Sequence, residues 1–131
     1  MTNATGFDSG RSGRGAAYVS DRSGAAHAKF MKLTARALAP LAIVSAWTLI
    51  GVVGEPYEAA RAVIGRPISA LALIGFIVIG AVHARYGMET IIDDYVHDPA
   101  KRELALKANK WVSTAIAAVW TLAILLIAAP R

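Results

Sequence analysis

Apolar residues in this chain are gathered into long blocks and do not alternate with polar residues at short intervals. Three stretches contain no Asp, Glu, Lys or Arg: residues 37–54, 67–84 and 111–130. A helix of roughly 18 to 20 residues rises about 27 to 30 Å, which is close to the thickness of the hydrocarbon layer of a bilayer. The pattern therefore predicts an all-α membrane protein. Its three transmembrane helices are expected at about residues 33–54, 67–92 and 108–129.

The composition agrees with a bilayer environment and restricts the cofactor chemistry. Of the 131 residues, 56% are hydrophobic and 18% are charged, which is more apolar than a soluble domain of this size. The chain has no cysteine. This excludes a disulfide-stapled fold, thiolate metal sites, iron–sulfur ligation and covalently attached c-type haem. Histidine remains as the candidate cofactor ligand, and the chain has three.

The basic residues predict how the spans are oriented. Of the 14 Lys and Arg residues, eleven precede the first span or lie between the second and third, and three lie in the first loop or the tail. Basic flanks resist translocation, so we expect a cytoplasmic N-terminus and a periplasmic C-terminus in a multi-pass protein of the bacterial inner membrane. The net charge of +5 is then explained by topology, and no nucleic-acid partner is expected.

The chain divides into a polar arm and an anchor domain. Residues 1–24 are rich in Gly and Ser and lack an apolar core, so they are expected to form a flexible cytoplasmic arm. Residues 25–131 are expected to form the three-helix anchor. Residues 55–66 are expected to be a short loop. Asp98 followed by Pro99 is typical of a helix N-cap and first turn, so the third helix should begin well before its apolar part.

His83 is an ionisable side chain within the charge-free stretch 67–84 of the second predicted span, which makes it a functional candidate. Gly80 and Gly87 share its helical face, and Gly75 is close to the same stripe. The missing side chains clear a flat space for either another helix or a planar cofactor such as haem. The spacing alone leaves both interpretations open. Haem ligation would require a second histidine from another chain, because His27 and His97 lie outside the spans.

A polar run follows at the end of the second span. Residues 93–98 contain two adjacent carboxylates, at Asp93 and Asp94, then Tyr95 and His97. Such a group at a membrane surface can deliver protons or hydrogen-bond a lipid-soluble substrate. It can equally be an ordinary solvated helix end with an interfacial tyrosine.

Residues 83–97 resemble the signature of the smaller hydrophobic membrane anchor of succinate dehydrogenase, complex II. That family has a histidine, a Gly-Met pair four and five residues later, and an Asp-Tyr pair eleven and twelve residues later. The matching residues are His83, Gly87, Met88, Asp94 and Tyr95. Residues 23–41 resemble, less closely, the segment in which the family's first helix begins.

The resemblance implies a role for each matched residue. His83 is expected to be an axial ligand of the iron of haem b, with the second axial histidine supplied by the other membrane anchor of the complex, which is of the cytochrome b556 type. Tyr95 is expected to hydrogen-bond a quinone carbonyl, with Asp94 as a supporting neighbour. Lys32 stands where the family usually has an arginine near the haem propionates, and Arg36 is a possible substitute one turn later.

The resemblance also implies partners and an activity. The chain is expected to pass electrons from the iron–sulfur protein of the complex to ubiquinone, in an assembly that also contains the flavoprotein. It is not expected to be catalytic alone. Two alternatives stay open: an anchor of fumarate reductase, and a haem-free structural membrane anchor.

Overall fold

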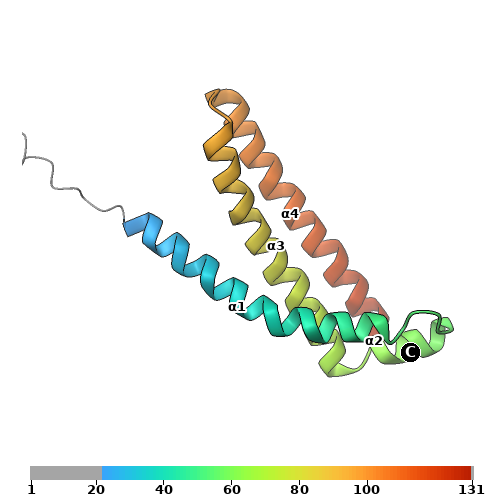
Figure 1. The fold of residues 1–131 in the computed structure, drawn as a ribbon. Coiled ribbons are helices and arrows are strands. Elements are labelled where there is room, and N and C mark those ends of the chain that lie inside the picture. Colours follow the sequence, from blue (N-terminus) through green and yellow to red (C-terminus); the bar gives the residue numbers. More distant parts are fainter. Residues whose placement is uncertain (1–21, 131) are drawn as a thin grey trace, which may run out of the picture.

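The computed structural model describes residues 22–130 and consists of four helices (Figure 1). They are α1 (Arg22–Ile50), α2 (Tyr57–Ile64), α3 (Pro67–Tyr95) and α4 (Pro99–Ala128). Three helical segments are long and apolar enough to cross a membrane: Gly24–Ile50, Pro67–Tyr95 and Pro99–Ala128. The predicted all-α architecture with three candidate spans is confirmed.

Helix α3 lies in the middle and carries most of the contacts between helices. Helix α4 runs antiparallel beside it, while α1 crosses it obliquely (Figure 1). We call the end where α3 passes into α4 through residues 96–98 the turn end, and the opposite end, where α2 lies, the α2 end. Among the described residues, no large apolar side chain is fully enclosed. Many apolar side chains are therefore left to contact lipid or another chain.

The contact between α1 and α3 follows a regular stripe along α1, which we call the α1–α3 seam. Its positions are spaced alternately four and three residues apart, as in a coiled coil, and none of them is exposed. They are His27, Met31, Thr34, Leu38, Leu41, Ser45 and Thr48.

Glycines on α3 face this stripe. A Cβ built on Gly87 would lie 3.7 Å from the Met31 side chain, and one on Gly75 would lie 3.4 Å from both methyls of Leu41. Small residues let two membrane helices approach closely. Buried Ser45 adds a polar contact across the seam, since its hydroxyl donates to the carbonyl of Ala72 at 3.3 Å.

Apolar packing and polar side chains join α3 to α4. Ile124 of α4 is buried against Ala70 and Leu73. Nearer the turn end, the amide of Asn109 donates to the carbonyl of Arg85 at 2.9 Å. Apolar packing at Ile124 and a hydrogen bond from Asn109 therefore both hold α4 against α3.

Helix α2 was missed by the sequence analysis, which expected only a loop at residues 55–66. Pro56 and Gly65 indicate a turn at each end, but the eight residues between them form a helix. A contact distant in sequence holds it: Arg61 donates from Nε to the carbonyl of Ile127 at 3.1 Å and from Nη2 to that of Ala129 at 2.7 Å. These bonds satisfy carbonyls that the end of α4 leaves unpaired.

The other boundaries differ more modestly from expectation. Helix α1 includes residues 22–24, which were assigned to the flexible arm, and residues 1–21 lie outside the described part of the chain. Helix α1 also continues through Pro40. The predicted start of α4 is confirmed, because the Asp98 side chain accepts from the backbone N–H of Lys101 at 2.9 Å and Pro99 is the first helical residue.

Replacing Gly75 with valine should weaken the α1–α3 seam. Even the Cβ would be in tight contact with Leu41, and the two further methyl groups would force the helices apart at a cost of about 1–3 kcal/mol. The midpoint of thermal unfolding of the detergent-solubilised protein should fall. Ala46→Val, at an exposed position of α1, is the control. An equal fall in both variants would contradict the seam.

Replacing Arg61 with methionine should loosen the last turn of α4. Methionine keeps most of the side-chain length but removes both hydrogen bonds, each worth about 1 kcal/mol. Backbone amides near the end of α4 should then exchange faster with deuterium, as measured by mass spectrometry. Arg66→Met, which removes an exposed guanidinium from the same end, should not change this rate. Unchanged exchange in Arg61→Met would show that the two bonds do not fasten α2 to α4.

Candidate functional site

His83 lies half-buried on α3 and is joined to α1 by a hydrogen bond across the seam. Its Nδ1 atom is 2.8 Å from the hydroxyl oxygen of Thr34. Thr34 is itself 8% exposed. The imidazole is therefore held at one of its two nitrogens, within the membrane-spanning part of the protein.

The second ring nitrogen of His83, Nε2, has no hydrogen-bond partner among the described residues. Nor is it enclosed, because the only fully enclosed polar side-chain atom without a partner in residues 22–130 is the Thr121 hydroxyl. Nε2 is therefore not sealed inside the described part of the chain. An unpaired polar nitrogen in hydrocarbon is costly, so a partner from outside the chain would stabilise it.

The glycines around His83 pack against α1. A Cβ on Gly80 would lie 3.7 Å from the side chain of Leu38, and Gly75 and Gly87 face Leu41 and Met31 in the same way. Of the two interpretations of this stripe, the structure has the helix–helix contact. The glycine stripe of α3 is therefore occupied by side chains of α1.

Tyr95 is the last residue of α3, at the turn end. Its side chain is 78% exposed, and within residues 22–130 its hydroxyl has no hydrogen-bond partner. A phenol in this position is free to donate to a carbonyl oxygen on a molecule outside the chain.

The adjacent carboxylates of Asp93 and Asp94 differ in their ion pairing. Asp93 forms an ion pair with Arg102 of α4, with Nη2 2.7 Å from Oδ1. Asp94 forms no such pair with another described residue. Instead it lines an open polar hollow where the start of α1 meets the end of α3, together with Asp93 and four other residues: Gly24, His27, Glu89 and Thr90. Asp94 and His27 therefore line the same hollow, whereas Tyr95 is not among its lining residues.

Lys32 is exposed on α1. It lies two residues before Thr34, and a step of two residues turns a helix by about 200°. Lys32 and Thr34 therefore point to nearly opposite sides of α1. Arg36, two residues after Thr34, is also exposed and has the same relation to it. Neither cation lies on the face of α1 that contacts His83.

Thr34 was not among the site residues predicted from the sequence, and His27 was expected to lie outside the spans. The ring of His27 lies edge-on to that of Tyr86, with centroids 5.9 Å apart, and Phe30 packs on the same tyrosine at 5.0 Å. The alternating four- and three-residue spacing that joins His27 to Thr34 is visible in the sequence. It would have identified both residues as facing α3.

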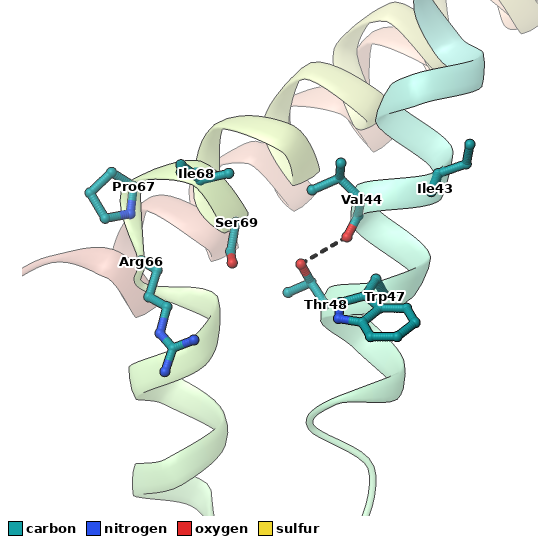
Figure 2. A pocket seen from close by; sticks show the side chains of 8 residues that line it. All are labelled: Ile43, Val44, Trp47, Thr48, Arg66, Pro67, Ile68 and Ser69. Carbon is teal, nitrogen blue, oxygen red and sulfur yellow. Dashed lines mark hydrogen bonds between the residues drawn. The ribbon is translucent and has the colours of Figure 1, made fainter.

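A second hollow lies between α1 and α3 at the α2 end, far along the seam from His83. Its volume is about 620 Å³, and its lining is mostly apolar (Figure 2). Trp47 and Arg66 line opposite sides of it, and the hydroxyl of Thr48 is turned back to the carbonyl of Val44 at 2.9 Å (Figure 2). None of the residues predicted from the sequence to bind a cofactor or substrate lies here.

Comparison with known proteins gives one match. Residues 15–127 match the family model described as succinate dehydrogenase/fumarate reductase transmembrane subunit. The match covers α1, α3 and all of α4 except its last residue, and it includes both His83 and Tyr95. No curated protein and no solved structure gives a significant match.

Proposed function

This chain belongs to the family of succinate dehydrogenase/fumarate reductase transmembrane subunits, and we propose that it is the smaller, haem b-binding membrane anchor of a bacterial succinate:quinone oxidoreductase. The observation that carries the proposal is the geometry of His83, a span histidine held at Nδ1 and open at Nε2. The family's enzyme is a complex of several proteins. In it this chain anchors the complex and serves electron transfer, and it is not catalytic by itself.

The residues present fit a haem. His83 would hold the iron through Nε2, because a neutral imidazole binds through its unprotonated nitrogen. The second axial histidine would come from the cytochrome b556-type anchor. When bound, haem b would supply one-electron redox chemistry at the level of the apolar spans. Lys32 is a weaker candidate for a propionate contact, since it lies on the face of α1 turned away from His83.

Tyr95 is proposed to hydrogen-bond a carbonyl oxygen of the quinone. Its phenol is exposed at the end of α3, where the polar head of a quinone could reach protons while its tail stays in lipid. Asp94, the neighbouring carboxylate, has no ion pair within residues 22–130. The rest of the pocket would be supplied by the cytochrome b556-type anchor and by the iron–sulfur protein, which takes its electrons from the flavoprotein.

The relative position of the two residues suits electron exchange. Twelve residues of continuous helix separate His83 from Tyr95, which is roughly 18 Å along the axis. A haem held by His83 would supply the electron donor for a quinone at Tyr95. The excess of basic residues at the turn end supports a cytoplasmic position for this end of the protein, in the bacterial inner membrane.

A haem-free structural anchor is the competing function, and one observation favours it. The glycine stripe is filled by α1, and His83 already has a hydrogen bond to Thr34. These contacts alone would account for a small-residue interface with a polar link. An anchor of fumarate reductase uses the same couple in the reverse direction and belongs to the same family.

Replacing His83 with leucine should abolish the b-type absorbance spectrum of the purified complex, because the iron loses an axial ligand. His97→Ala changes a histidine beyond the end of α3 and should leave the spectrum unchanged. Haem content that survives His83→Leu would refute the ligand role. A wild-type complex that assembles without haem would support the structural anchor instead.

Replacing Tyr95 with phenylalanine should slow quinone reduction by about tenfold, the equivalent of one hydrogen bond of about 1.4 kcal/mol. Succinate oxidation measured with a soluble electron acceptor should not change, because the flavin and iron–sulfur centres are untouched. Tyr57→Phe, at the α2 end and 61% exposed, is the matched control. Equal loss of both activities in Tyr95→Phe would argue against a quinone role.

A further inference from the structure

We infer that Thr34 is a positioning residue that sets the tautomer of His83, an inference that rests on the proposed haem role of that histidine. The hydroxyl oxygen of Thr34 lies 2.8 Å from Nδ1 of His83, and in this assignment it accepts a hydrogen bond from Nδ1–H. With the ring proton on Nδ1, the lone pair of a neutral imidazole is on Nε2. Thr34 thereby holds His83 in the form that can bind an iron through its open nitrogen.

The hydrogen-bond partners of the Thr34 hydroxyl lead to this assignment of the proton. Its hydroxyl oxygen is 3.1 Å from the carbonyl of Phe30 and 3.1 Å from that of Met31. Both carbonyls can only accept, whereas the hydroxyl has one hydrogen and two lone pairs. A hydrogen directed to these carbonyls leaves a lone pair facing His83, so the proton between the two side chains belongs to Nδ1.

The packing around Thr34 fixes the distance. On the seam, Met31 lies one turn before it and Leu38 one turn after it, and these side chains pack over Gly87 and Gly80. The glycines set how closely α1 approaches α3 on both sides of the hydrogen bond. Thr34 is also branched at Cβ and almost fully buried, which restricts its χ1 rotation. Its hydroxyl therefore stays directed at the imidazole.

The hydrogen bond has a chemical consequence for a metal. A ligating histidine usually donates its other ring N–H to a protein acceptor, which orients the ring and increases the basicity of the ligating nitrogen. A more basic nitrogen stabilises the oxidised, more positively charged iron. Loss of the Thr34 acceptor should therefore raise the reduction potential of the haem and weaken its retention.

The seam contains two other buried hydroxyls that provide matched controls. Ser45 donates across the seam to the backbone carbonyl of Ala72. Thr48 donates within its own helix to the carbonyl of Val44. Neither contacts His83. Their replacement removes a buried hydroxyl from the same interface without affecting the imidazole.

The test compares Thr34→Val with Thr34→Ser, Ser45→Ala and Thr48→Val in the purified complex. Valine keeps the shape of threonine but cannot accept a hydrogen bond, whereas serine can. We expect Thr34→Val to shift the haem midpoint potential upward, to change the EPR spectrum of the oxidised haem and to weaken haem retention by about 10- to 100-fold. Thr34→Ser should stay close to wild type, as should both controls.

The outcomes separate this inference from the proposed function. A His83-dependent haem whose potential and EPR spectrum are the same in Thr34→Val as in wild type overturns the role of Thr34 alone. Equal shifts in Thr34→Val, Ser45→Ala and Thr48→Val also overturn it, because they would report general loosening of the seam. A wild-type complex without His83-dependent haem overturns the proposed function and the inference together.

Discussion

The close approach of α1 to α3 organises the described part of the protein. Membrane helices gain little from the hydrophobic effect against each other, so they associate through tight packing and hydrogen bonds between helices. Here three glycines of α3 admit the Met31, Leu38 and Leu41 side chains of α1. Thr34 and Ser45 add polar links between them. The same contacts that hold α1 in place determine the orientation of His83.

The described helices leave apolar surface and polar groups without partners, which agrees with one component of a larger complex. Its helices form an open arrangement around α3, and large apolar side chains such as Trp47 and Trp111 are mostly exposed. The open Nε2 of His83 and the free phenol of Tyr95 are polar groups that lack partners within the described chain. Both would gain partners from cofactors and proteins outside it. Under the proposed function, this chain would supply single groups to sites that other molecules complete.

The sequence predicted what depends on local pattern and missed what depends on distant contacts. Charge-free blocks and the Asp98 cap predicted three spans and the start of α4, because burial in lipid and capping act within a few residues. Helix α2 was missed because Arg61 fastens it to a carbonyl 66 residues away. Thr34 was missed for the same reason, since His83 is 49 residues away. The chemical candidates His83, Asp94 and Tyr95 came from residue type and resemblance, whereas only the structure distinguishes the two nitrogens of the imidazole.

A cryo-electron microscopy map of the purified complex, at a resolution that shows side chains, would test most directly whether the seam presents His83 to an iron outside the chain. We expect the iron of a haem bonded to Nε2 of His83, with the Thr34 hydroxyl still within hydrogen-bond distance of Nδ1. A map in which Nε2 is instead hydrogen-bonded to another protein side chain, with no haem beside it, would contradict the account.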